Sequence, residues 1–112
     1  MKACYDVRIT RQAYSQIAEV RHYIAFELMN PEAAERVLTN ILNAIKSLSD
    51  MPSRNPLVES EPWYTNGVRK LIVNHFNVYY WIEEQTSKVY VTAVVYQKRD
   101  QLQQQELMSF DN

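Results

Sequence analysis

The sequence predicts an α+β domain: a two-layer sandwich in which a helical hairpin packs on one face of a small, mostly antiparallel sheet. Three observations predict it. An early stretch alternates apolar and polar residues, two long segments carry apolar residues every three or four positions, and three short strand-like runs follow near the end. The element order is β-α-α-β-β-β, and the helical hairpin must bury its apolar stripe against the sheet.

The first half of the chain predicts a strand and two helices. Residues 5–9 alternate as a half-buried strand does, and Thr10 is a suitable helix N-cap. The apolar spacing then predicts an amphipathic helix over residues 11–29. Asn30 and Pro31 end that helix and begin the next, with Asn30 as the cap and Pro31 at the first helical position.

The second half predicts a long loop and a meander. The second helix runs to about residue 49, and residues 50–67 form either a functional loop or a plain crossover to the sheet. Strand-like runs over 68–73, 78–84 and 88–96 are joined by short turns, the first of them over residues 74–77, so they predict antiparallel neighbours.

Alternation within these runs predicts which side chains share a face. The two predicted sets are Val78, Tyr80 and Ile82, and Val89, Val91, Ala93 and Val95. Tyr79 and Trp81 then face the opposite way to Tyr80, so both faces of the sheet carry large aromatic residues. The Gln-rich stretch over residues 98–112 predicts a short C-terminal helix or a tail.

Composition restricts the classes of function. The 112 residues, 46% hydrophobic and 22% charged, fit one globular domain, so we expect a single domain over residues 1–112. One cysteine and two histidines exclude an internal disulfide and a metal cage, and the single glycine excludes Gly-rich phosphate loops, so we expect no metal and no cofactor. The lack of a membrane span or signal peptide predicts a cytoplasmic protein.

Five motifs carry a resemblance to a known family. They are Asn30-Pro31-Glu32-Ala33-Ala34, Ser47-Leu48-Ser49-Asp50-Met51-Pro52, Gly67-Val68-Arg69-Lys70-Leu71, Phe76-Asn77-Val78-Tyr79-Tyr80 and Val95-Tyr96-Gln97-Lys98-Arg99-Asp100. In this order and spacing, over roughly residues 5 to 100, the chain resembles the RelE/ParE toxin superfamily. The resemblance implies the toxin of a bacterial type II toxin–antitoxin module that a cognate antitoxin neutralises.

Two branches of this superfamily imply different functions. RelE-like members are ribosome-dependent mRNA endonucleases, whereas ParE-like members have a longer helical hairpin and poison DNA gyrase. Lys70 and Arg99 match the nuclease pattern, but Asn77 stands where that pattern has an arginine, and Gln105 where it has an aromatic acid–base residue. The incomplete set and the long hairpin favour the ParE-like branch. The alternatives are an mRNA endonuclease and an inactive member that serves as a binding scaffold.

The residues themselves allow the same comparison. A nuclease needs an acid–base group and cations at the phosphate, and Lys70, His75 and Arg99 are the candidates. A solvated turn explains His75 better than a catalytic role does, and an outward-facing strand position explains Lys70 equally well. The formal net charge of −1 is poorly matched to binding the phosphate-rich ribosome.

A second set of residues is suited to binding a target or an antitoxin. Trp63 and Tyr64 lie in the long loop, where an aromatic pair either anchors an interface or fills a gap between sheet and helices. Arg69, Tyr96 and Lys98 complete this set, although an ion pair with a helix carboxylate also explains Arg69. The expected partners are the antitoxin and either gyrase or the ribosome and its mRNA, in a homodimer or a toxin–antitoxin hetero-oligomer.

Overall fold

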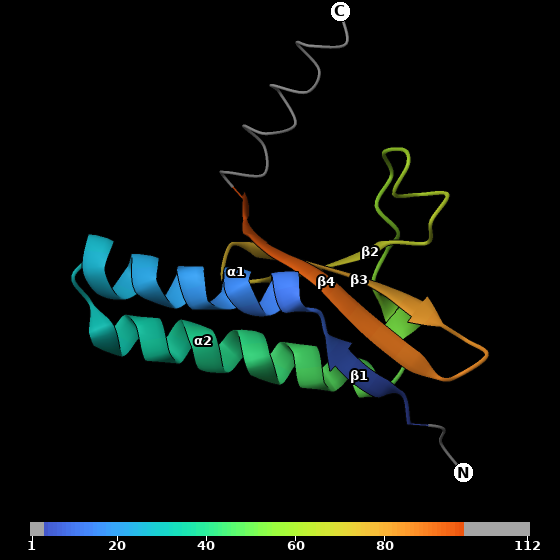
Figure 1. Ribbon diagram of the computed structural model, residues 1–112, viewed down its shortest axis with the longest axis horizontal. Helices are drawn as coiled ribbons and strands as arrows, with labels where there is room; N and C mark the ends of the chain where they lie inside the picture. Colours follow the sequence, from blue (N-terminus) through green and yellow to red (C-terminus); the bar gives the residue numbers. More distant parts are fainter. Residues whose placement is uncertain (1–3, 98–112) are drawn as a thin grey trace, which may run out of the picture.

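The computed structural model describes residues 4–97 and has two layers, a helical hairpin and a sheet (Figure 1). Four strands form one sheet in the order β1-β4-β3-β2. The strands are β1 (Asp6–Ile9), β2 (Arg69–Val73), β3 (Phe76–Glu83) and β4 (Lys88–Tyr96). Strand β1 is parallel to β4 and the other pairs are antiparallel, which confirms the α+β, mostly antiparallel prediction. The predicted C-terminal helix or tail lies outside the described residues.

Side-chain caps begin both helices of the hairpin. Helix α1 (Arg11–His22) begins where the Thr10 hydroxyl accepts a hydrogen bond from the Ala13 amide at 3.2 Å. Helix α2 (Pro31–Lys46) begins where the Asn30 side chain accepts from the Ala33 amide at 3.1 Å. Each cap satisfies an amide that lacks an intrahelical partner. Both predicted caps are therefore confirmed.

The end of the first helix differs from the prediction of an α-helix to residue 29. After His22 the chain continues as a π-helical segment, η1 (Tyr23–Glu27), in which the Leu28 amide donates to the carbonyl of Tyr23 at 3.3 Å. Such wider turns are rare and mostly occur as a single turn within a longer helix. The chain then reverses through Met29, whose φ of 49° is left-handed.

The β2–β3 turn is shorter than predicted. Only Asn74 and His75 connect the strands, both with positive φ (48° and 67°), while Phe76 and Asn77 already belong to β3. Two consecutive left-handed residues match the twist of a two-residue hairpin, which is why the strands can pair right up to them. The prediction of a four-residue turn over 74–77 was therefore wrong.

A bulge in β4 changes which of its residues face the helices. Tyr80 pairs with Val91 but Tyr79 pairs with Ala93, so Thr92 is an extra residue that has no paired residue on β3. The alternation shifts by one position there, and Val94 becomes buried. The prediction that Ala93 and Val95 share a face with Val89 and Val91 was therefore wrong.

One hydrophobic core lies between the hairpin and the sheet. Its helical members are Ala13, Ile17, Val20, Ile24, Ala34, Ile41 and Ile45, with Leu48 from the 3₁₀ turn η2 (Ser47–Ser49). Its strand members are Phe76, Val78, Tyr80, Val89, Val91 and Val94. Removing these apolar surfaces from water is the main force that holds the two layers together. Neither α1, α2 nor any other helix within residues 4–97 has the length and apolarity that crossing a bilayer requires.

Candidate functional site

The face of the sheet that points away from the core carries a set of aromatic and basic side chains. We call it the open face and define it by Arg8, Lys70, Ile72, Tyr79, Trp81 and Tyr90. Each member alternates along its strand with residues that pack in or against the core. The open face is thus the surface of the sheet that the helical hairpin does not use.

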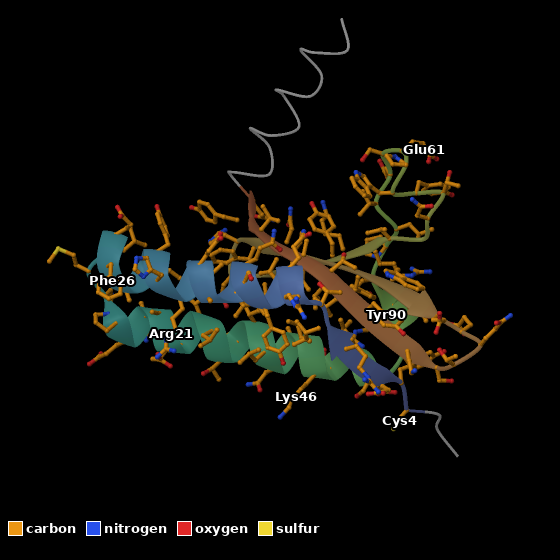
Figure 2. All side chains as sticks on the ribbon, viewed as in Figure 1. Cys4, Arg21, Phe26, Lys46, Glu61 and Tyr90 are labelled. Atoms are coloured by element: carbon orange, nitrogen blue, oxygen red, sulfur yellow. The ribbon has the colours of Figure 1, made fainter. Side chains whose placement is uncertain are left out.

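An aromatic stack occupies one end of the open face. The rings of Trp81 and Tyr90 are stacked with centroids 4.8 Å apart and an interplanar angle of 22°. Arg8 of β1 is the register partner of Tyr90, which Figure 2 shows on β4. The guanidinium of Arg8 is 2.7 Å from the Asp6 carboxylate, and this hydrogen-bonded pair raises the pKa of Arg8. The stack offers a flat aromatic surface beside a permanently charged cation.

A hydrogen-bonded pair outside the open face also affects a titratable group. The Tyr5 hydroxyl donates to the carboxylate of Glu84, at 3.1 and 3.2 Å from its two oxygens. This hydrogen bond raises the pKa of Tyr5, with a smaller contribution from desolvation. The interaction joins the N-terminal segment to the β3–β4 turn.

The middle of the open face contains neutral amides rather than a cluster of cations. Lys70 is paired with Tyr79 across β2 and β3. Asn77, buried to 6% exposure, donates to the Tyr79 hydroxyl at 3.3 Å and accepts from the Gln97 side chain at 3.2 Å. The position at which the nuclease pattern has an arginine therefore holds a buried, hydrogen-bonded amide.

The candidate nuclease residues are spread along the β-hairpin that β2 and β3 form. Lys70 precedes the end of β2 by three residues, which is roughly 10 Å of extended strand, and His75 lies beyond that end in the exposed turn. Arg99, like Lys98, lies outside the described residues. Within residues 4–97, Lys70 and His75 therefore form no compact acid–base site, and their nuclease role stays a prediction.

The predicted aromatic pair protrudes on a loop. Trp63 and Tyr64 are 51% and 52% exposed, in a segment that projects from the sheet away from the helices (Figure 1). Figure 2 shows Glu61 at the tip of this segment, where its carboxylate accepts hydrogen bonds from the amide and hydroxyl of Thr65. The two aromatic side chains are accessible to a partner rather than packed between the layers.

The remaining candidates lie at opposite ends of the sheet. Arg69 donates to the carbonyls of Ser53 and Asn55 at 3.1 and 2.6 Å, so its guanidinium holds the long loop against β2. Tyr96, at the end of β4, packs against Phe76 with ring centroids 5.3 Å apart. Tyr96 also borders a groove of about 810 Å³ between α1 and the end of β4. Roles of Arg69 and Tyr96 in partner binding stay predictions.

Sequence reasoning missed two features of this surface. The pairing of Trp81 with Tyr90 depends on register between strands, so no local pattern in the sequence indicates it. The buried amide of Asn77 was interpreted as part of a turn, although the turn-forming Asn74 just before His75 could have indicated the shorter connection. Within residues 4–97 no group of three or more His, Cys, Asp or Glu side chains could hold a metal ion.

Together these features define a small α+β domain with half-buried aromatic groups on the open face of its sheet and an exposed aromatic pair on a projecting loop. Residues 7–101 match the family described as the ParE toxin of the type II toxin–antitoxin system parDE. The chain therefore belongs to this family of toxins, which confirms its membership of the RelE/ParE superfamily.

Solved structures of two other proteins share this fold. The chain is similar to a chain from a chromosomal ParDE toxin–antitoxin system of P. aeruginosa, with a TM-score of 0.65 and 19% identity over 84% of this chain and 97% of that one. It is also similar to a chain of the toxin–antitoxin complex RelBE2 from Mycobacterium tuberculosis, with a TM-score of 0.62 and 20% identity over 84% and 92%. No curated protein matches the chain at a significant level.

Proposed function

We propose that this type II toxin inhibits bacterial growth by binding an essential protein target such as DNA gyrase, and that a cognate antitoxin neutralises it. The observation that carries the proposal is the match to the ParE toxin family over residues 7–101. The long helical hairpin, which consists of α1, η1 and α2, agrees with the ParE-like branch of the superfamily.

The surface chemistry supports a protein target over RNA. Binding RNA on the ribosome depends on neutralising phosphates with Lys and Arg. The middle of the open face instead has the hydrogen-bonded amide of Asn77 beside Lys70, and the chain has a formal net charge of −1. Exposed aromatic residues such as Trp63 and Tyr64 are typical anchors of protein–protein interfaces.

An antitoxin segment has two kinds of surface available. Strands β1 and β2 are the edges of the sheet, where an extended peptide can add a further strand. The groove between α1 and the end of β4 is large enough, at about 810 Å³, for the apolar face of a helix. The two similar structures belong to toxin–antitoxin systems, which supports such a partner.

The experiment that tests the target is direct. The protein is induced in a bacterial host while DNA and protein synthesis are pulse-labelled in parallel, and the purified protein is added to a gyrase supercoiling reaction. We expect early loss of DNA synthesis with translation intact, and inhibition of supercoiling. A Trp63→Ala/Tyr64→Ala double variant should inhibit more weakly, whereas Lys46→Ala on the exposed end of α2 should match the wild type. Intact DNA synthesis together with unaffected gyrase would refute the proposal.

One observation favours the nuclease as the second candidate. The Gln97 amide donates to the carbonyl of His75 at 2.9 Å, so the chain that continues to Lys98 and Arg99 starts beside His75. For an endonuclease, induction would stop translation first, and mRNA would be cleaved on ribosomes in a purified translation reaction. His75→Gln and Arg99→Ala would each abolish that cleavage. If neither DNA synthesis nor translation falls, the inactive scaffold is the remaining function.

A further inference from the structure

The loop that carries Trp63 and Tyr64 is closed at the sheet and projects from it as a separate element. We call it the projecting loop and define it as residues 58–68. At its base the Val58 amide donates to the carbonyl of Val68 at 2.8 Å, so the chain leaves the sheet and returns to it at one place. Figure 1 shows the projecting loop extending beyond the sheet on the side away from the helices. Its conformation therefore depends on contacts within the loop.

Backbone hydrogen bonds close the projecting loop in a turn that ends at Gly67. The amide of Gly67 donates to the carbonyl of Tyr64 at 3.1 Å, and the amide of Val68 donates to the carbonyl of Trp63 at 3.0 Å. These two bonds and the left-handed φ of 73° at Gly67 form a Schellman motif, which commonly ends a helical turn. Within residues 4–97, and apart from its two chain neighbours, no heavy atom lies within 4 Å of the position that a Cβ would take at Gly67. Only the backbone conformation therefore restricts this residue.

A side chain holds the start of the same turn. The Tyr64 amide donates to the carbonyl of Ser60 at 3.0 Å, as in one turn of an α-helix. The Glu61 carboxylate accepts from the amide and the hydroxyl of Thr65 at 3.2 and 2.6 Å, and both bonds end on the oxygen Oε2. Figure 2 shows Glu61 at the tip of the loop. Glu61 therefore stabilises the turn and still has a second carboxylate oxygen for a partner.

The turn holds two aromatic side chains in place before any partner binds. Trp63 and Tyr64 are half-exposed, and both contribute backbone groups to the hydrogen bonds of the turn. An aromatic side chain has only two χ angles, so on a fixed backbone it loses little conformational entropy when it binds a partner. The projecting loop is therefore pre-formed for docking.

The projecting loop is also the site of unpaired negative charge. Its charged residues are Glu59 and Glu61, and it has no Lys, Arg or His, so its formal charge is −2 while that of the whole chain is −1. Both side chains are exposed, and within residues 4–97 neither carboxylate forms an ion pair. Arg69, the cation nearest to the loop along the chain, donates instead to backbone carbonyls outside it.

An aromatic ring and unpaired carboxylates on one small surface fit a cationic partner. The face of a Trp ring attracts an Arg guanidinium or a Lys ammonium, and a carboxylate accepts charge-assisted hydrogen bonds from the same groups. The phosphates of a nucleic acid or of an anionic lipid would instead be repelled by Glu59 and Glu61. The chemistry of the loop therefore selects a protein surface that is rich in Arg or Lys.

We propose that the projecting loop docks on a cationic surface of the protein target, whose Arg or Lys side chains contact Trp63, Glu59 and Glu61. Gly67 is a positioning residue, because it closes the turn that presents these side chains. The inference rests on the proposed function only in taking the partner to be a protein target. Cationic surfaces of this kind are typical of proteins that bind nucleic acid, so the loop occupies a place where phosphates otherwise bind.

An NMR titration with a cationic peptide tests this partner chemistry without the cellular target. The isotope-labelled full chain, made by cell-free synthesis, is titrated with an octa-arginine peptide at low salt. We expect saturable shifts of the backbone amides within residues 59–67 and of the Trp63 indole N–H, and an affinity that falls as salt is added. An octa-serine peptide is the control probe and should shift none of these signals.

Substitutions separate the charge of the loop from its conformation. The Glu59→Gln/Glu61→Gln double variant keeps the acceptor oxygens and should weaken octa-arginine binding about tenfold, whereas Glu19→Gln, at an exposed position of α1, should keep the wild-type Kd. Gly67→Val places a branched side chain at a positive φ and should also weaken binding about tenfold, because the docking conformation becomes a minor one. Gly67→Asn tolerates the left-handed conformation and should retain most of the binding. Circular dichroism checks that all variants are folded.

The outcomes separate this inference from the proposed function. Absent shifts, or shifts confined to other acidic surfaces such as that of Glu27, overturn the inference even if gyrase is inhibited. A Gly67→Val variant that binds as tightly as the wild type overturns the positioning role of Gly67. A single-stranded RNA that shifts the same loop amides overturns the cationic partner and assigns the loop to nucleic acid. Octa-arginine binding at the loop together with unaffected gyrase upholds the cationic partner and refutes gyrase as the target.

Discussion

Tyr80→Phe removes one buried hydroxyl and tests how the long loop is held on the core. The side chain of Tyr80 is fully buried, and its hydroxyl donates to the carbonyl of Pro52 at 2.6 Å and accepts from the Asn55 amide at 3.1 Å. Phenylalanine keeps the ring in place but leaves both loop groups without this partner. Each unsatisfied buried group costs about 1–3 kcal/mol, and relaxation of the loop toward water recovers part of it.

We expect Tyr80→Phe to lower the free energy of unfolding by about 2 kcal/mol. For a chain of this size, that corresponds to a fall in Tm of roughly 6–12 °C. Urea denaturation followed by circular dichroism measures the first quantity, and a thermal scan measures the second. Tyr64→Phe is the matched control, because the side chain of Tyr64 is 52% exposed on the projecting loop and water can replace the lost hydroxyl. The reasoning is refuted if Tyr80→Phe loses no more stability than Tyr64→Phe.

The comparison of wild type with Tyr80→Phe also gives a prediction for alkaline pH. Burial raises the pKa of Tyr80 above its ordinary value, although the Asn55 hydrogen bond and the nearby charge of Arg69 oppose part of the effect. Folding therefore favours the protonated form of Tyr80, and this preference contributes to the free energy of unfolding. The contribution is fully present below the ordinary tyrosine pKa of about 10, and it is lost as the pH rises through the higher pKa of the folded state. The stability difference between wild type and Tyr80→Phe should narrow above about pH 10, which urea midpoints across that range would show.

Three further substitutions test local features of the fold by urea denaturation. Asn30→Ala removes the cap of α2 and should cost about 1 kcal/mol, whereas Asn43→Ala, at an exposed interior position of that helix, should be neutral or slightly stabilising. Met51→Gly should stabilise by about 0.5–1 kcal/mol, since the exposed Met51 has a left-handed φ of 48°, and an unchanged midpoint would argue against strain there. His75→Gly should stabilise by a similar amount, because Asn-Gly is the preferred pair for a two-residue turn with two positive φ values, and a loss of stability would contradict that turn geometry.

Much of the fold could be predicted because its signals are local. A helix cap such as Asn30 needs only the next three residues, and the apolar spacing of α1 and α2 depends on a period that any window of the sequence reveals. The strand runs depend on alternation of the same local kind. The position of Trp63 and Tyr64 in a loop follows from the turn-forming residues around them, but whether they fill a gap or are exposed was left open by the sequence, and the structure shows that they are exposed.

Other parts of the fold and site depend on contacts between distant segments. The bulge at Thr92 lies in the pairing of β3 with β4, and the Thr92 hydroxyl donates to the carbonyl of Tyr79, thirteen residues away. The stack of Trp81 on Tyr90 and the hydrogen bonds of Arg69 to the loop carbonyls likewise join residues that no local pattern relates. The exposure of Phe26 depends on which side of the hairpin meets the sheet.

The sequence by itself therefore determined the order of elements, the helix caps, the two-layer architecture and the toxin family, because periodicity, capping and motif order are properties of neighbouring residues. Only the tertiary structure decided the register past Val91, the position of β1 beside β4, and the side of the hairpin that remains uncovered. The same segments could pack in several alternative ways, and those features depend on which packing is the most stable. The most stable packing buries the most apolar surface while its backbone hydrogen bonds are satisfied.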